Sequence, residues 1–203
     1  TIGQANFVNT HPFQHGRWVF AHNGNIKNFD AVRDKIHSLI SPDLAKYILG
    51  STDSETLFYL FLTYINKVTT LHDDKHDYNL VNQAISTALL DLKEIIGPCY
   101  KENEGKPTET YLTFLLSNGD LMFGFQAGKT LFYSTYKEKC PESKTCPFHD
   151  PCCEEKRTKG KINHLLFTSE PIDGENIWTE MKNGELIGID NSFNLMISNI
   201  DIF

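Results

Sequence analysis

The chain has 203 residues, of which 40% are hydrophobic and 12% aromatic, and this composition is sufficient for a globular domain with a substantial core. The net charge is -7, and acidic and basic residues are interspersed along the chain. This pattern argues against a nucleic-acid or anionic-membrane surface, because both need clustered Lys and Arg. No run approaches the roughly 18 apolar residues of a membrane span, and residues 1–12 lack a signal-peptide layout. We therefore expect a cytoplasmic protein whose partners are small molecules or proteins.

Apolar spacing and helix-start signals predict the elements of the first half of the chain. In order, these are a strand over 17–22 that enters a tight turn at Asn23-Gly24, a helix over 29–39 capped by Asn28, a short helix opened by Pro42, a buried helix that starts at the capping-box pair Thr52 and Glu55, and a helix over 79–96 that stops at Gly97-Pro98.

Beyond residue 97 the periodicity becomes that of strands, which we expect over 110–117, 121–126, 130–136, 162–168, 177–181, 185–189 and 193–197. Asn118-Gly119 joins the first two as a hairpin, and Asn183-Gly184 marks another tight turn. Residues from about 137 to 161 form a polar, Cys-rich insertion. The helices fall together with strands on both sides, so the sequence predicts one α+β domain over 1–203, with helices packed in layers against antiparallel sheet.

Three polar clusters in the first 55 residues contain groups that chemistry could use: TIG at 1–3, HNGN at 22–25 and STDSE at 51–55. Each alone has an ordinary structural explanation. Asn-Gly after a strand is usually a turn, and Asp53 at a helix start is favoured by the positive end of the helix dipole. The histidine of NTHPF, at 9–13, is most simply a satisfied loop residue. Their order along the chain is therefore more informative than any one of them.

Taken together, TIG, NTHPF, WVFAHNGNI (18–26) and STDSE resemble the class II glutamine amidotransferases and their relatives that hydrolyse small γ-glutamyl compounds. The resemblance covers residues 1 to about 68, with weaker support from TSEP at 168–171 and from Trp178. It implies a four-layer αββα sandwich of the N-terminal-nucleophile hydrolases, with the first strands missing from this chain.

The resemblance also implies roles for single residues. Amide hydrolysis passes through a tetrahedral oxyanion, which needs preorganised hydrogen-bond donors. Asn23 and Gly24 match the family's pair of donors, the side-chain amide of the Asn and the backbone N–H of the Gly. Asp53 matches the aspartate that binds the α-amino group of glutamine, and Thr1 matches a threonine that helps bind its α-carboxylate.

The histidines of this region are spaced too irregularly for a metal face on a helix. We expect His22 to orient the turn at Asn23-Gly24. His11 either stabilises the NTHPF loop or lines the substrate pocket, and the sequence leaves both open.

Two parts of the family's site are not in this chain. The pattern expects an arginine three positions before Thr1 and an N-terminal cysteine well upstream. In the family that cysteine attacks the amide, its own α-amino group acts as base, and water hydrolyses the γ-glutamyl thioester. None of the five cysteines present can supply a free α-amino group. We therefore expect this chain alone to be inactive.

Thr1 has a rival interpretation, because a threonine with a free α-amino group is itself the nucleophile of some N-terminal-nucleophile hydrolases. Such a nucleophile must begin the first core strand. Thr1 instead leads through a short loop into NTHPF, so the substrate-binding role is favoured.

The insertion holds Cys140, Cys146, His149, Cys152 and Cys153. This local clustering does not resemble a disulfide framework. Two interpretations stay open. The first is a solvated insertion with free thiols, and the second is a structural zinc site made by Cys140, Cys146, His149 and Cys152. The spacing is unusual for zinc, because only one gap has the short length of paired ligands.

The predicted function is hydrolysis of a γ-glutamyl amide, either glutamine or a γ-glutamyl peptide related to glutathione, because the motifs recognise the glutamyl head that both share. We expect no cofactor for this reaction. The expected partner is the small-molecule substrate, and a homo-oligomer or a synthetase partner stays open. The contrasting hypothesis is a non-catalytic regulatory remnant that binds a γ-glutamyl ligand or a protein partner.

Overall fold

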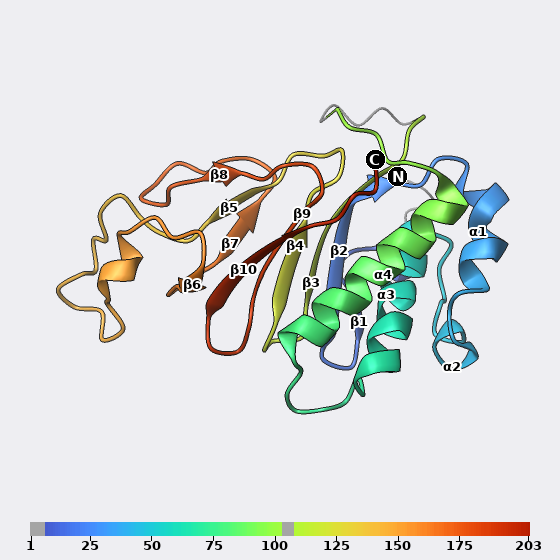
Figure 1. Ribbon diagram of the computed structural model, residues 1–203, viewed down its shortest axis with the longest axis horizontal. Coiled ribbons are helices and arrows are strands. Elements are labelled where there is room, and N and C mark those ends of the chain that lie inside the picture. Colours follow the sequence, from blue (N-terminus) through green and yellow to red (C-terminus); the bar gives the residue numbers. More distant parts are fainter. Residues whose placement is uncertain (1–6, 103–107) are drawn as a thin grey trace.

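The computed structural model describes residues 7–102 and 108–203, which form two antiparallel sheets and a group of helices (Figure 1). The larger sheet has seven strands in the order β1 (Phe13–His15), β2 (Trp18–Asn25), β3 (Tyr111–Ser117), β4 (Met122–Phe125), β9 (Glu185–Ile189), β10 (Asn194–Asn199) and β6 (Gly160–Lys161). The smaller sheet has three strands in the order β7 (Leu166–Thr168), β5 (Phe132–Ser134) and β8 (Thr179–Glu180).

The helices pack together beside β2 and β3 (Figure 1). They are α1 (Phe29–His37), α2 (Pro42–Ala45), α3 (Asp53–Val68) and α4 (Tyr78–Ile96), and two short 3-10 helices, η1 (Phe7–Asn9) and η2 (Pro151–Cys153), lie elsewhere. α3 is the central helix, because all its residues from Asp53 to Ile65 are buried. This confirms the prediction that the helix opened by STDSE is buried.

The seven-stranded sheet has a different apolar cluster on each face. Leu116 and Phe123 belong to the core that the helices complete. Their chain neighbours Leu115 and Met122 pack instead with residues of the three-stranded sheet, such as Tyr133. Successive side chains of a strand point to opposite faces. The large sheet therefore lies between the helices on one face and the small sheet on the other.

This mixed fold with antiparallel sheets confirms the predicted α+β class. The hairpin expected at Asn118-Gly119 is present, since β3 pairs with β4 and Gly119 has a φ of 88°. The four-layer arrangement and the missing first strands stay predictions.

Two of the predicted helix starts differ in detail. Asn28 precedes α1 in a left-handed conformation, with a φ of 52°, and its side chain makes no capping hydrogen bond, so the predicted cap is wrong. Thr52 does cap α3, because its Oγ1 accepts a hydrogen bond from the Glu55 amide at 3.1 Å. The Glu55 carboxylate binds the amides of Leu49 and Gly50, at 2.9 and 2.6 Å. Glu55 thus ties the preceding loop to the helix.

Candidate functional site

The Asn23-Gly24 pair lies inside strand β2 and does not form a turn. Asn23 is opposite Thr113 and Gly24 is opposite Leu112 in the ladder with β3. The prediction of a turn that His22 orients is therefore wrong. The local sequence favours a turn, but the long strand β3 pairs with β2 as far as Asn25 and keeps the pair extended.

Gly24 is required by close packing, because a side chain has no room at this position. A Cβ atom on Gly24 would overlap Nε2 of His22 and the carbonyl oxygen of Tyr111. The glycine therefore lets a histidine ring and a neighbouring strand come against the backbone, at a residue that the sequence predicts to be an oxyanion donor.

The register of the sheet determines where the Gly24 N–H points. The Leu112 amide donates to the Ala127 carbonyl on the β4 side at 2.8 Å, so Leu112 directs its backbone groups away from β2. In an antiparallel ladder the residue opposite then also directs its N–H away from the shared ladder. In the described part of the chain, β1 pairs with β2 only as far as Phe20. The Gly24 N–H thus points toward the edge of β2 beyond the end of β1.

Asn23 lines a cavity of about 440 Å³ at this end of β2. The cavity lies where the two sheets face each other, because its walls come from β2, β3, β7 and the residues just before β5. Its lining residues are His11, Ala21, His22, Asn23, Thr113, Phe114, Leu115, Thr130, Leu131, Phe167, Thr168 and Ser169. Amide, imidazole and hydroxyl groups thus converge on an otherwise apolar cleft, which is the usual composition of a small-molecule site.

Asp53 is held beside this strand at the first turn of α3. Its side chain is 3% exposed. Oδ2 accepts the Ile26 amide at 2.8 Å, and Oδ1 accepts the Ser54 amide at 2.9 Å. A carboxylate has about four acceptor positions, so two such bonds leave capacity for a further donor. Asp53 is therefore connected to the strand that carries Asn23 although the two are far apart in sequence.

His11 stands between this cavity and a second one. Burial lowers the pKa of His11, and the nearby Asp53 carboxylate partly opposes that effect. The ring packs edge-on against Phe13, with centroids 4.9 Å apart. The structure thus gives His11 both a contact within the NTHPF loop and a place at the cavity wall, so the two roles that the sequence leaves open are compatible.

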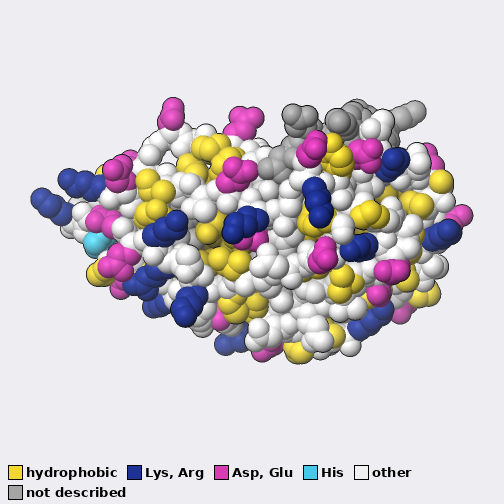
Figure 2. Space-filling view, turned by 45° about the horizontal axis from the view of Figure 1, so that its top comes forward, with side chains coloured by type: hydrophobic (Ala, Val, Ile, Leu, Met, Phe, Trp, Pro, Cys, Tyr) yellow, Lys and Arg dark blue, Asp and Glu magenta, His cyan; other side chains and the backbone are white. Residues whose placement is uncertain are grey.

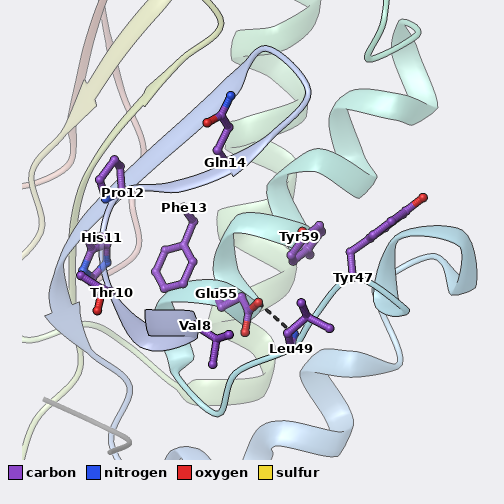
Figure 3. Close-up of a pocket in the computed structure, with 10 residues that line it drawn as sticks. All are labelled: Val8, Thr10, His11, Pro12, Phe13, Gln14, Tyr47, Leu49, Glu55 and Tyr59. Carbon is purple, nitrogen blue, oxygen red and sulfur yellow. Dashed lines mark hydrogen bonds between the residues drawn. The ribbon is translucent and has the colours of Figure 1, made fainter. Parts of the chain in front are cut away.

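The second cavity has a volume of about 510 Å³. Figure 3 shows Phe13, Glu55 and Tyr59 among the side chains that line it, between residues 8–14 on one side and Tyr47 and Leu49 on the other. The dashed line marks the Glu55 contact with the Leu49 amide, and both Glu55 oxygens are bound to backbone amides. Asn23 does not line this cavity, and Asp53 lines neither of the two. The cavity beside Asn23 is therefore the candidate site.

Thr1 lies outside the described residues. Of the other predicted site residues, Asn23 and His11 line the candidate cavity, Gly24 follows Asn23, and Asp53 accepts a hydrogen bond from the Ile26 amide. Sequence reasoning missed Ser54, whose hydroxyl lies 2.9 Å from Nδ1 of His22. Its place in STDSE, directly after Asp53, was the available signal.

The cysteines of the insertion are free thiols. Cys140 and Cys152 are buried, whereas Cys146 and Cys153 are partly exposed. Within residues 7–102 and 108–203, no group of three or more His, Cys, Asp or Glu side chains is arranged to hold a metal ion. The zinc site stays a prediction that only metal analysis can test.

On the face shown in Figure 2, acidic and basic side chains alternate with apolar ones, and neither sign dominates a large area. Among the helices of the described residues, none has the length and hydropathy needed to span a bilayer.

Comparison with known proteins supports one family. The chain is 33% identical over 122 residues to the Saccharomyces cerevisiae protein DUG3, named as a glutamine amidotransferase, which covers 59% of this chain and 34% of that protein. A Haemophilus influenzae protein, also named as a glutamine amidotransferase, is 27% identical over 202 residues, covering 94% of this chain and 57% of that one. The chain thus spans between a third and three fifths of the length of these relatives.

A solved structure of a glutamine aminotransferase class-II domain protein from Silicibacter pomeroyi has the same fold, with a TM-score of 0.58 and 22% identity over 96% of this chain and 72% of that one. The family model described as "Glutamine amidotransferases class-II" matches residues 1–196. The chain therefore belongs to the class II glutamine amidotransferases.

Proposed function

We propose that the intact protein hydrolyses a γ-glutamyl amide, either glutamine or a γ-glutamyl peptide, through a thioester on a cysteine upstream of Thr1. The observation that carries this proposal is the convergence of Asn23, the outward N–H of Gly24 and the carboxylate of Asp53 at one end of β2. A reaction that develops an oxyanion next to an ammonium group needs donors and an anion in this arrangement.

In the proposed mechanism, the upstream cysteine thiolate attacks the γ-carbonyl carbon after its α-amino group has taken the thiol proton. The carbonyl oxygen becomes an oxyanion that accepts hydrogen bonds from the Asn23 amide and the Gly24 N–H. The amine leaves with the proton from the α-amino group, and water then cleaves the thioester to give glutamate. Asp53 binds the substrate α-ammonium, while Thr1 and an arginine three positions before it bind the α-carboxylate.

The small sheet supports the proposed four-layer arrangement. In the described part of the chain, β7 pairs only with β5, so its other edge is free to pair. Thr168, the last residue of β7, lines the same cavity as Asn23. We propose that upstream strands extend the small sheet at this edge and carry the cysteine to the cavity, with further helices as the fourth layer.

The test uses the intact protein, including the residues before Thr1. We expect ammonia from glutamine or glutamate from γ-glutamyl dipeptides, and Asn23→Ala should lower kcat by about 100-fold to 1,000-fold. The matched control is Asn25→Ala on the same strand, because the Asn25 amide already donates to the Glu109 carbonyl at 2.8 Å. This control should lose some stability and keep its kcat.

Two results would contradict the proposal, the first its assignment of Asn23 and the second the hydrolase itself. Equal turnover in Asn23→Ala and the intact protein would remove the oxyanion role. Binding of glutamine without turnover by a folded intact protein would instead favour the non-catalytic regulatory remnant.

A further inference from the structure

His22 is a buried histidine on the strand that carries the proposed oxyanion donors. Its ring stacks over Phe20, with centroids 6.1 Å apart and an interplanar angle of 21°. Nδ1 lies 2.9 Å from the Ser54 hydroxyl of α3. The side chain is 8% exposed although it lines the candidate cavity. Burying a polar ring in this position is unfavourable unless its contacts compensate.

The ring also occupies the space beside Gly24. Nε2 and the Tyr111 carbonyl oxygen together fill the volume that a Gly24 side chain would need. The position of the Gly24 backbone, whose N–H is a proposed donor, is thus defined by the His22 ring on one side and β3 on another.

Two buried hydrogen bonds connect this strand to the start of α3, one on each side of the donors. His22 contacts Ser54 before them, and Ile26 donates to Asp53 at 2.8 Å after them. Asp53 and Ser54 are adjacent, and the Ser54 amide donates to the Asp53 carboxylate. Residues 22–26 are therefore attached at both ends to the start of the helix that carries the proposed ammonium-binding residue.

The charge state of His22 suits this position. Burial lowers its pKa to about 4, against a smaller opposing effect of the Asp53 carboxylate, with His11 and Tyr111 also facing the ring. The imidazole is therefore neutral near pH 7. A neutral ring leaves the negative charge of Asp53 available for a substrate ammonium, whereas an imidazolium would compete for it.

The groups around the His22 ring determine which of its two nitrogens carries the proton. Nε2 is buried without a well-formed hydrogen bond, and the Tyr111 carbonyl is the backbone group that faces it. A carbonyl can only accept, so the ring proton belongs on Nε2. The Ser54 hydroxyl then donates to Nδ1 at 2.9 Å in preference to Asp53 Oδ1, its other acceptor, at 3.4 Å.

We propose that His22 and Ser54 are positioning residues for the hydrolysis: the neutral His22 ring, held by Ser54, fixes the strand carrying Asn23 and Gly24 against the helix carrying Asp53. This inference rests on the proposed function, because it assigns these residues to the same site. Neither residue touches the reacting atoms, so their effect is on the placement of the donors.

The kinetic test compares variants of the intact protein, with kcat expressed per mole of folded enzyme. Ser54→Ala and His22→Ala should each lower kcat and kcat/KM for the active γ-glutamyl substrate by about 10-fold with an unchanged KM, because misplaced donors weaken only the transition state. His22→Asn, which can keep a bond to Ser54, should recover part of the rate. The matched control is Ser134→Ala, another buried serine, whose hydroxyl donates to the Tyr136 carbonyl at 3.1 Å. It should keep its kcat.

The second test does not depend on turnover. Nitrogen NMR of the imidazole should show the neutral Nε2–H form of His22 at pH 7, and Ser54→Ala should disturb it. In the same variant, hydrogen exchange of the Ile26 amide, which donates to Asp53 at 2.8 Å, should accelerate by about 10-fold, while that of Gly188 in β9 should not change.

The outcomes separate the two proposals. Wild-type kcat in Ser54→Ala, or a His22 that is charged at pH 6, would overturn the positioning role. An intact wild-type protein without turnover would reject the hydrolase. The exchange of the Ile26 amide would then support or overturn the fixed position of residues 22–26 without any measurement of turnover.

Discussion

The motif region, residues 9–68, and the cysteine-rich insertion, residues 137–161, both concentrate side chains capable of chemistry, but the fold organises them differently. In the motif region, buried hydrogen bonds join residues 27 and 32 positions apart, from Ile26 to Asp53 and from His22 to Ser54. In the insertion, Cys140 and Cys146 bond through their amides to Glu154 and Glu142, within the insertion itself.

The comparison indicates that polar residues clustered in the sequence form a candidate binding site when different helices and strands fix their side chains in place. α3 is buried and packs on β2, so the polar groups at its start are placed rigidly. The insertion is held from outside by more exposed bonds, such as those from Asn163 to the Phe148 carbonyl and to Cys153 Sγ, and its Phe148 side chain is 81% exposed. Four changes test this contrast, from the largest expected effect to the smallest.

Replacing Gly24 with alanine should lower the free energy of unfolding by about 3 kcal/mol or more, because the new methyl group overlaps His22 and the Tyr111 carbonyl. Chemical denaturation measures this loss. The control is Gly16→Ala, where the nearest atoms lie 3.9 Å from the added Cβ and the φ of 58° is left-handed, so its loss should be about 1–2 kcal/mol. Equal losses in the two variants would show that the motif region is not tightly packed.

Acid should destabilise the motif region through His22. The unfolded chain takes up a proton at this residue near its ordinary pKa of 6.5, whereas the folded chain does so only near 4. The unfolded state therefore binds more protons between these values, and stability falls as the pH drops through this window, by about 3 kcal/mol in all. Denaturant unfolding curves recorded between pH 7 and pH 4 measure how steeply the free energy of unfolding falls with pH.

Comparison with His22→Asn isolates this contribution, because the other buried histidines remain in both proteins. The free energy of unfolding of His22→Asn should fall less steeply with decreasing pH than that of the unchanged protein. An unchanged slope would mean that His22 titrates normally in the folded protein.

Thr52→Ala should cost about 1 kcal/mol, since it removes the hydroxyl that caps the Glu55 amide at the start of α3. Ser41→Ala is the matched control at the start of α2, because the Ser41 hydroxyl is buried without a hydrogen-bond partner. Its loss should leave stability unchanged or improved. Thermal unfolding of both variants shows whether the Thr52 hydroxyl contributes more to stability than the Ser41 hydroxyl does.

Cys146→Ser should change stability by less than about 0.5 kcal/mol, because the residue lies in the weakly supported insertion. Metal analysis of the purified protein accompanies this measurement. Stoichiometric zinc that disappears in Cys146→Ser, together with a large loss of stability, would reverse the comparison and establish the insertion as a metal centre.

Local patterns were sufficient for much of the fold. The helix predicted over 79–96 is α4 at Tyr78–Ile96, and the strand predicted over 185–189 is β9 with the same bounds. Helix caps and side-chain periodicity depend on residues a few positions apart, so they can be read from the sequence. The family is likewise indicated by the order of four short motifs, which is a property of the sequence alone.

Only the tertiary structure decided how the candidate site is built. Pairing with β3 made Asn23-Gly24 part of a strand although its local preference is a turn. The same pairing brought the Tyr111 carbonyl to Gly24, and the packing of α3 brought Ser54 to His22. These contacts join residues tens of positions apart, and no local pattern encodes such distances, because they depend on which elements pair and in which register.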